Sequence, residues 1–484
     1  MTIDPTRLRQ RLDTLFGIDP RALAALRIAM GLLILVDLIT RLPFLTLFYT
    51  DDGLLPRWLA VGMDPLSRWS LHALGGSQTA TLGLFALAGL FAIMLLVGYR
   101  TWLATFASWA LLGSLQLRNP YILDGGDYVL RVLLFWSLFV PLNRCWSVDA
   151  RRALTGPPVS PTVLSVGTAA IFLQIGLIYF FAGAIKVLGS EWRDGTAVYW
   201  VANHEYWARP LAAWISTLPT LVLHVFTYGV LALEIVGSLL LFAPMWTHRF
   251  RMLAVGLFLL FHLATGLSIE LGLFPLISSA GLILFVPARW WDRFASLRLP
   301  SQSPLPSSDH AARHHRWPAR LRSGLVAIAL TFTVVANVET MRRYWIFPNR
   351  VRRVAVVLGV GQGWGMYAPS PYNEGFRVEI RGTRADGSDF LIDGGGQGAR
   401  WAPVARMQDG YRPKIYLEWI ATGGWDVAVH HFAHWVCRQQ ATAPGAGNAT
   451  RVVTVAKLVN AESPAIPTVG SSEITLSSLV CGSD

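Results

Sequence analysis

Lys186 is the side chain of this sequence whose type most clearly suggests chemistry. It ends a long apolar run in the stretch FFAGAIKVLGSEWRDG, residues 180–195. The chain holds 41 lysines and arginines, but the lysines are only Lys186, Lys414 and Lys457. An arginine keeps its charge in a protein, whereas a partly desolvated lysine can release its proton near neutral pH. Lys186 is therefore a candidate catalytic base.

A plainer interpretation of Lys186 is that it snorkels. Its stem then lies along apolar surface while its ammonium reaches the headgroup region, and Trp192 nearby fits the aromatic belt of a membrane interface. Arginine snorkels equally well, however, and this chain uses arginine almost everywhere else. The residues alone leave both interpretations open, a lysine that accepts a proton and a lysine that snorkels.

Other ionisable residues stand within apolar runs, where a charge is costly and is usually functional. Glu234 has no cation near it in the sequence, and His262 stands alone among apolar residues, where hydrogen-bonded packing is the plainer role. Asp127 and Arg131 are four residues apart, which places both on one helix face and predicts a contact between them. The candidate cavity or substrate-binding residues are therefore His262, Glu234, Asp127, Tyr128, Arg131 and Trp192.

No metal site is predicted from the cysteines and histidines. Metal-binding spacing is absent among the cysteines, which are Cys145, Cys437 and Cys481. A solvated linker, PSQSPLPSSDHAARHHRWP, carries three histidines that chance explains more simply than a metal, namely His310, His314 and His315. Cys437 and Cys481 can pair if the C-terminal region is extracytoplasmic.

The elements that must position these side chains are membrane helices. Of the 484 residues, 53% are hydrophobic and only 14% are charged, whereas roughly 25% are charged in soluble domains. About 20 apolar residues cross a bilayer. The sequence predicts nine spans, at residues 22–40, 79–97, 101–118, 127–141, 161–186, 218–243, 251–269, 271–287 and 323–341.

The arginines predict how these spans are oriented. With nine spans and a cytoplasmic N-terminus, the basic segments fall on the cytoplasmic side and the C-terminus falls outside. These segments are residues 1–21, the turn at Arg100, the WSVDARR loop, the HRFR turn and residues 288–322. The arginines between Arg342 and Arg353 follow the last span and fit this orientation less well. The net charge of +12 thus indicates topology and does not indicate a nucleic-acid partner.

The sequence pattern changes after residue 354. FRVEIRG and DFLID alternate apolar and polar residues around an Asp-Gly turn, which predicts a β-hairpin. KIYLEWIA and TRVVTVAKLV predict further helices or strands. The predicted fold is a polytopic α-helical membrane protein with a smaller β-rich extracytoplasmic domain. Its parts are an N-terminal cytoplasmic segment (1–21), a helical membrane domain (22–298), a cytoplasmic linker (299–322), a last transmembrane helix (323–341) and the C-terminal domain (354–484).

Four separated blocks resemble the vitamin K-dependent γ-glutamyl carboxylases and the wider HTTM (horizontally transferred transmembrane) domain family. They cover residues from about 20 to 290 in the family order. The blocks are LRIAMGLLILVDLITRLPFL with FYTDDGLLPR, DGGDYVLRVLLFW with PLNRCWSVDA, IYFFAGAIKVLGSEWRDG, and FHLATGLSIELGLFPLISSAGLILFVP. GQGWGMYAPSP and IRGTRADG resemble the start of the β-rich domain that follows the spans in these proteins.

The resemblance implies a base role for Lys186, which matches the lysine that deprotonates reduced vitamin K in the carboxylases. It also implies a reduced quinone of the vitamin K or menaquinol type as cofactor, with oxygen and carbon dioxide as co-substrates. His262 matches a family histidine and is carried over as a cavity residue. Gly126, however, stands where the carboxylases carry a histidine that serves the hydroquinone, so glutamate carboxylation is not carried over.

Two functions remain open at this point. One is a membrane-embedded carboxylase-like enzyme that uses a quinol, oxygen and a lysine base to modify a secreted or membrane protein. The alternative is a non-catalytic factor that binds a quinone or lipid or helps a secreted protein to mature. The Arg-rich, Lys-poor usage is typical of a high-GC bacterium, which predicts an inner-membrane location. A transporter is disfavoured because the pattern shows no inverted repeat.

Overall fold

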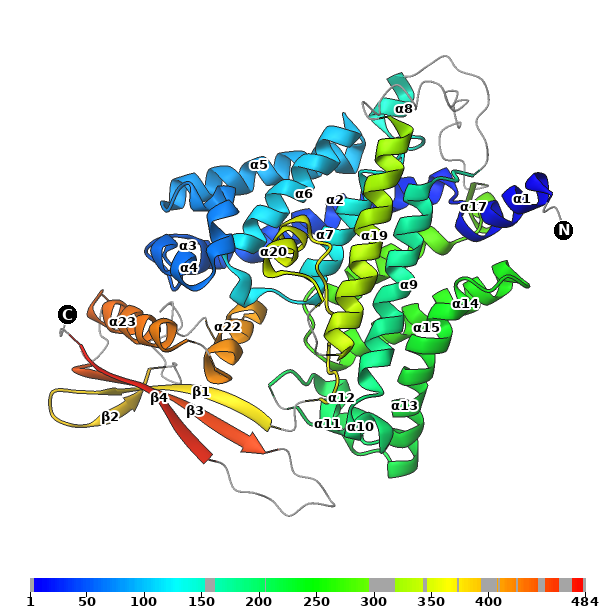
Figure 1. Ribbon diagram of the computed structural model, residues 1–484. Coiled ribbons are helices and arrows are strands. Elements are labelled where there is room, and N and C mark those ends of the chain that lie inside the picture. The colour runs from blue at the N-terminus through cyan, green and yellow to red at the C-terminus, as the bar shows by residue number, and fades with distance from the viewer. Residues whose placement is uncertain are drawn as a thin grey trace.

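The chain forms a large helical body with a small C-terminal domain beneath one end of it in the view of Figure 1. The computed structural model describes residues 4–152, 162–204, 206–295, 318–342, 346–371, 374–392, 407, 410–423, 425–442, 449–460 and 472–481. The three histidines expected in the linker lie outside the described residues.

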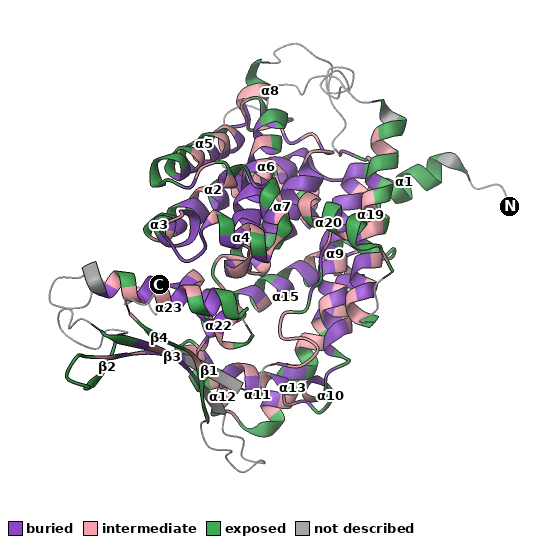
Figure 2. Ribbon diagram, turned by 60° about the vertical axis from the view of Figure 1, so that its left-hand side comes forward, coloured by how far each residue is buried: buried purple, intermediate pink, exposed green. Residues whose placement is uncertain are grey.

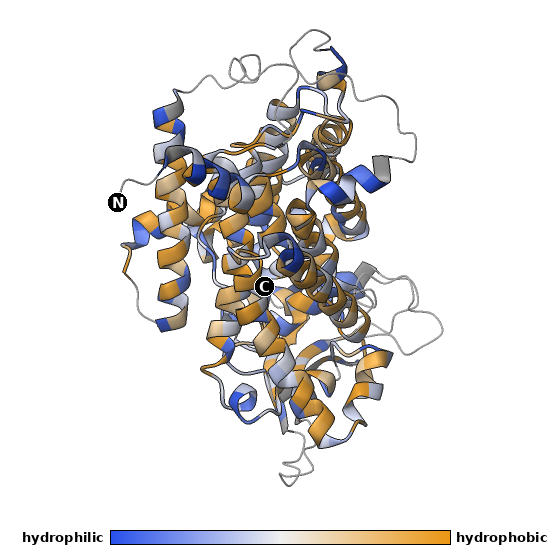
Figure 3. Ribbon diagram, turned by 90° about the vertical axis from the view of Figure 1, so that its right-hand side faces the viewer, coloured by the Kyte–Doolittle hydropathy of each residue, from blue (hydrophilic) through white to orange (hydrophobic). Residues whose placement is uncertain are grey.

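Six helical segments are long and apolar enough to cross a membrane. They are Pro20–Tyr49, Gln78–Val97 (α5), Val166–Lys186 (α9), Thr220–Leu240, Thr247–Ser268 (α15) and Arg320–Arg342. The first comprises α2 (Pro20–Arg41) and α3 (Leu45–Tyr49), the fourth comprises α13 (Thr220–Ala232) and α14 (Ser238–Leu240), and the last lies in α19 (Ala319–Arg342). Hydrophobic residues line most of these helices (Figure 3). In four of the six, only 22–28% of the apolar window is buried, so this chain is a membrane protein in which these four helices turn apolar surface outward.

Three of the nine expected spans are not confirmed as membrane-crossing. They form α6 (Thr101–Arg118), α7 (Gly125–Ser137) and α16 (Phe274–Leu282), which a short turn Ile283–Phe285 extends. α7 has 13 residues, which is about 20 Å at 1.5 Å per residue, against roughly 30 Å of hydrocarbon. Nearly all of its residues are buried among neighbouring helices. α7 owes its apolar composition to packing inside the body, where the buried residues gather (Figure 2), whereas α6 also exposes the apolar side chains Trp102, Leu103 and Phe106.

Loops that the sequence predicts to be cytoplasmic contact one another at one end of the helical body. Arg27 of α2 donates hydrogen bonds to carbonyls at the end of α5 and to the carbonyl of Trp146. Asp149 lies in the short helix α8 (Val148–Arg152), which follows α7. Its carboxylate accepts a hydrogen bond from the backbone N–H of Arg100 at the start of α6. Arg251 at the start of α15 donates to the carbonyl of Leu15. The basic loops that the sequence assigns to one side of the membrane are therefore in contact with one another in the structure.

Short helices fill the two ends of the body. Near the basic loops lie α1 (Pro5–Phe16) and α17 (Ala288–Ala295). The opposite end carries α4 (Arg57–Met63), α10 (Ser190–Arg193), α11 (Ala197–Ala202) and α12 (Pro210–Ser216). α20 (Asn349–Leu358) follows α19 and leads into the C-terminal domain.

The C-terminal domain is a four-stranded antiparallel sheet with two helices. The strand order is β2-β1-β3-β4, with β1 at Glu374–Thr383, β2 at Asp389–Leu391, β3 at Arg451–Asn460 and β4 at Ser472–Val480. The predicted hairpin is confirmed as β1 and β2, which pair from Thr383 opposite Asp389 around a turn with Gly387 at φ 82°. This positive φ favours glycine because a side chain would clash.

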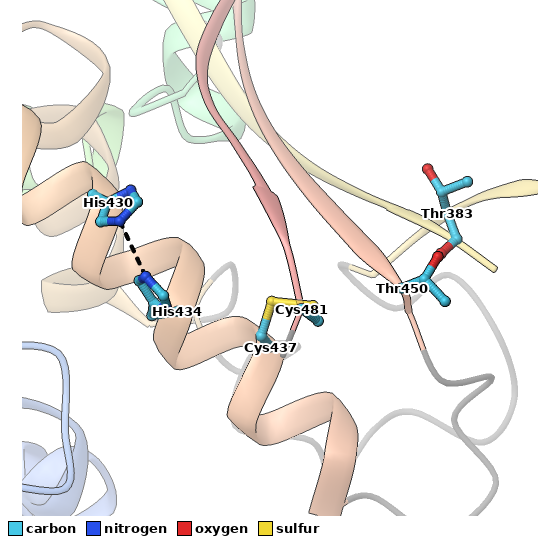
Figure 4. Close-up of a disulfide and its surroundings, with 6 residues drawn as sticks. All are labelled: Thr383, His430, His434, Cys437, Thr450 and Cys481. Carbon is cyan, nitrogen blue, oxygen red and sulfur yellow. Dashed lines mark hydrogen bonds between the residues drawn. A yellow bond between two sulfur atoms is a disulfide. The ribbon is translucent and has the colours of Figure 1, made fainter. Parts of the chain in front are cut away.

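The two helices make this domain more mixed than the β-rich expectation. KIYLEWIA lies in α22 (Tyr411–Ala421), and α23 (Asp426–Thr442) follows it. Both helices bury one face against the sheet and the helical body, as the buried Tyr416 and Phe432 illustrate. A disulfide joins Cys437 of α23 to Cys481 just after β4, with the Cα atoms 5.5 Å apart (Figure 4). The pairing that the sequence left open is therefore formed.

Candidate functional site

Lys186 and Glu234 form a buried ion pair between two candidate spans. The Lys186 ammonium donates to both carboxylate oxygens of Glu234, at 2.6 Å to Oε1 and 2.8 Å to Oε2. The side chains are only 6% and 4% exposed. The ammonium therefore does not extend to the surface as a snorkelling lysine would, and the acid without a sequence-local cation finds its partner 48 residues away.

The pair depends on a local irregularity and on a small residue. Glu234 lies in a single π-helical turn, Leu233–Gly237, between α13 and α14, and such turns frequently occur at functional sites. Gly183 of α9 packs directly against this turn, because a Cβ there would lie 2.7 Å from Ile235 and 3.0 Å from Glu234. The Ala-Gly pair that precedes Lys186 in the sequence thus lets α9 approach the turn closely enough for the ion pair.

Trp192 covers the ion pair and links it to the C-terminal part of the chain. The Lys186 Nζ atom lies 5.2 Å from the centre of the Trp192 ring, a cation–π arrangement. Trp192 is nearly buried and donates through Nε1 to the backbone carbonyl of Tyr367 at 2.8 Å. The segment GQGWGMYAPSP, which contains Tyr367, therefore helps to close this site.

His262 lies in a second polar contact on the same face of α9. Its Nε2 atom is 2.7 Å from the hydroxyl of Tyr179, which stands two helical turns before Lys186. Tyr179 stacks on Phe258 with ring centres 3.9 Å apart, and Phe274 approaches the His262 ring. His262 Nδ1 is buried, and no hydrogen-bond partner for it exists in the described part of the chain. This nitrogen therefore has capacity left for a ligand.

Asp127 lies in a closed ring of four charges, and its predicted contact with Arg131 is wrong. Arg41 bridges Asp37 (2.8 Å) and Asp127 (2.5 Å). Arg412 of α22 bridges the same two carboxylates, at 2.7 Å to Asp37 and 2.8 Å to Asp127. Two guanidinium groups therefore neutralise two aspartates, and one of the four comes from the C-terminal domain.

Arg131 is engaged elsewhere, which explains the incorrect prediction. It donates to the carbonyls of Val356 and Val357 at the end of α20 and to Oε1 of Gln116. The last carbonyls of a helix lack partners within the helix and carry partial negative charge, so a guanidinium satisfies them. Tyr128 is 41% exposed. Helical spacing permitted the Asp127–Arg131 pair, but better-placed partners on other elements took both residues.

A further cluster of charged and aromatic residues lies where the C-terminal domain contacts the helical body, and it was not predicted from the sequence. Lys414 pairs with Glu270 at 2.7 Å and lies over the rings of Tyr206 and Trp207. Burial raises the pKa of the nearby Glu418 carboxyl to about 7, while a hydrogen bond with Trp207 acts in the opposite direction. The rarity of lysine was the available signal, because both lysines whose side chains are described pair with a glutamate beneath an aromatic ring.

Gly126 leaves no room for the histidine of the carboxylases. A Cβ at this position would lie 3.0 Å from the backbone of Phe274 and 2.9 Å from Oδ1 of Asp124. Phe274 also contacts His262, so the two regions adjoin. Elsewhere in the molecule, a pocket of about 550 Å³ lies between α4, α23 and β4.

Comparison with known proteins identifies a family to which the helical body is similar. The model of the HTTM domain family matches residues 17–290, more than half of the 484 residues. The uncharacterized protein YitO of Bacillus subtilis (strain 168) is 28% identical over 225 residues, which are 45% of this chain and 71% of the relative. No solved structure matches the chain significantly. The family match includes Lys186, Glu234 and His262 and ends before the C-terminal domain.

Proposed function

Because the chain belongs to the HTTM domain family, we propose that it is a membrane-embedded, carboxylase-like protein in which Lys186 and Glu234 together accept a proton from a lipid-soluble quinol. One observation carries this proposal, namely the buried pair in which both oxygens of Glu234 hold the Lys186 ammonium. The relation of this family to the vitamin K-dependent carboxylases supports a proton-accepting lysine at this place.

The pair can act as a base because burial acts on both of its charges. Transferring one proton over the 2.6 Å from Nζ to Oε1 makes both groups neutral. In a buried site that excludes water, the free-energy difference between this neutral form and the ion pair is far smaller than in aqueous solution, because burial penalises both charges. The neutral form presents a free amine, which can take a proton from a substrate hydroxyl while Glu234 retains the first proton.

Two features of the residues near the pair, a hydrogen-bonding nitrogen and an aromatic surface, fit a reduced quinone. A quinol supplies a weakly acidic hydroxyl and a pair of electrons, and oxygen and carbon dioxide are further co-substrates if the chain is carboxylase-like. The unpartnered Nδ1 of His262 offers a hydrogen bond to a quinol oxygen, and the stacked rings of Tyr179 and Phe258 offer an aromatic wall. Glutamate carboxylation is not part of the proposal, because Phe274 fills the space beside Gly126.

A non-catalytic role is the second candidate. A factor that binds a quinone or lipid, or that helps a secreted or membrane protein to mature, requires no free base. The closed space at Gly126 favours this candidate, and so does an ammonium already engaged by Glu234 and Trp192. The Lys186 variants described in the Discussion separate the two candidates.

The quinone can be tested directly. We expect a menaquinone-type quinone to co-purify with the detergent-solubilised protein and to be identified by lipid extraction and mass spectrometry. His262→Phe should reduce its occupancy several-fold, because the hydrogen-bonding nitrogen is lost while the aromatic ring is kept. His248→Phe, at a histidine on the opposite half of α15, serves as the control. Equal quinone content in the wild type, in both variants and in an unrelated membrane protein would contradict quinone binding at His262.

We further propose a cytoplasmic N-terminus and an extracytoplasmic C-terminal domain in the inner membrane of a bacterium. Nine helical passes place the two ends of the chain on opposite sides, whereas six would return the C-terminus to the side of the N-terminus. The contacts of Arg21 with the carbonyl of Ala288 and with Asp292 hold the segment after α16 beside the start of α2, which supports an odd number of passes. The disulfide between Cys437 and Cys481 fits an oxidising compartment outside the cytoplasm.

Reporter fusions test this orientation. Alkaline phosphatase fused after Asp484 should be active, and green fluorescent protein fused there should be dark. The same reporters inserted after Arg152, in a basic loop, should give the reverse pattern. Fluorescence from the C-terminal fusion would show that the number of crossings is even.

A further inference from the structure

We propose that His430 and His434 of α23 form a binding site for a divalent transition-metal ion, with Cu²⁺ bound most tightly. The Nε2 atoms of these two imidazoles lie 3.1 Å apart (Figure 4). The site belongs to the C-terminal domain, outside the part that the family model matches, and it is independent of the chemistry proposed at Lys186.

The separation of the two nitrogens suits two ligands of one ion. A metal-bound imidazole nitrogen lies about 2.0–2.1 Å from the ion, so two neighbouring ligands of a tetrahedral or square-planar ion are roughly 2.9–3.4 Å apart. Helical geometry produces this arrangement, because residues four apart lie one above the other on one face. Both rings already turn their Nε2 atoms toward each other, so little rearrangement is required to bind an ion.

The surroundings leave space for the rest of a coordination sphere. The two histidines line the pocket of about 550 Å³, together with Asp426, Trp58 and Ser477. Asp426 lies one turn before His430 on the same helix and can supply a carboxylate oxygen after a change of rotamer. Among the described residues no group of three histidine, cysteine or acidic side chains is close enough to hold an ion. Two imidazoles with water completing the sphere are therefore the expected coordination.

This ligand set selects among metals. Imidazole nitrogen suits copper, nickel and zinc, and the general order of affinity places Cu²⁺ above Ni²⁺ and Zn²⁺ and far above Mn²⁺. Mg²⁺ and Ca²⁺ prefer oxygen ligands and should not compete. The neighbouring disulfide between Cys437 and Cys481 anchors the last turns of α23 to the end of β4, which holds the helix that carries both histidines.

The test is a titration of the full-length, tag-free protein with Cu²⁺ and Zn²⁺. We expect one high-affinity Cu²⁺ per chain, with electron paramagnetic resonance showing coupling to two imidazole nitrogens. His430→Gln and His434→Gln should each weaken Cu²⁺ binding by more than about 10-fold, since even loss of an outer-shell partner typically costs 10–100-fold. Zn²⁺ should compete with Cu²⁺ and Mg²⁺ should not.

His431→Gln is the matched control, because His431 lines the same pocket but lies against the carbonyl of Gly53 and the ring of Trp58. This variant should bind Cu²⁺ like the wild type. The proposal is overturned if both single variants at His430 and His434 keep wild-type affinity, or if His431→Gln weakens binding as much as they do. In either case the 3.1 Å contact is only a hydrogen bond between two imidazoles.

Discussion

Replacing Lys186 with arginine should abolish function as fully as replacing it with alanine. Arginine keeps the charge and can still pair with Glu234, but it does not release its proton, so a proton-accepting site cannot work with it. Loss of general-base catalysis typically costs about 10²–10⁴-fold in rate. Quinol oxidation by the purified protein, or rescue of a deletion strain, provides the measurement. Wild-type behaviour of Lys186→Arg would end the enzymatic interpretation and leave the non-catalytic role.

Loss of function by misfolding must be separated from loss of the base. Lys186→Ala leaves a buried carboxylate without its cation, which typically destabilises by about 3–5 kcal/mol. Lys186→Met combined with Glu234→Leu removes both charges and keeps similar volumes, and such replacements are often neutral or stabilising. We expect this double variant to fold, as judged by its thermal unfolding in detergent, and to be inactive. A folded and active double variant would show that the pair is purely structural.

Arg412→Ala should destabilise the attachment of the C-terminal domain more than any other single arginine change in that domain. The Arg412 side chain is only 10% exposed and shares the buried Asp37 and Asp127 with Arg41. Its removal leaves two buried carboxylates with one guanidinium, an imbalance that typically costs about 3–5 kcal/mol. Limited proteolysis should cut between α20 and β1 far faster in the variant, and the thermal unfolding temperature should fall.

Arg381→Ala is the matched control for this experiment. Arg381 also bridges two carboxylates, those of Glu379 and Glu473, but on the open face of the sheet. Exposed ion pairs contribute about 0–1 kcal/mol, so the change at Arg381 should leave proteolysis and unfolding nearly unchanged. Equal effects of Arg381→Ala and Arg412→Ala would mean that the charge ring does not hold the domain. Arg412→Lys should restore only part of the stability, because an ammonium cannot match the fork that reaches both aspartates.

The class of the protein and several of its elements were determined by the sequence. Long apolar runs and the β1–β2 hairpin are local patterns, since hydrophobic periodicity and an Asp-Gly turn act over a few residues. α9 therefore ends at the expected Lys186, and FRVEIRG forms the expected strand. The family relation was also visible, because its blocks are contiguous stretches. The number of membrane-crossing helices was not determined by the sequence, because a helix buried inside the body, such as α7, is also rich in apolar residues.

Only the tertiary structure decided which charges meet. Glu234 lies 48 residues from Lys186, and Arg412 lies 285 residues from Asp127, so no local spacing could pair them. The i,i+4 rule favoured Asp127 with Arg131, but that rule ranks only partners on one helix. A buried charge takes whichever partner gives the best geometry in three dimensions, because its desolvation must be offset by nearby opposite charge. The partners of the buried charges therefore followed from how α2, α7, α20 and α22 pack, and not from their separation along the chain.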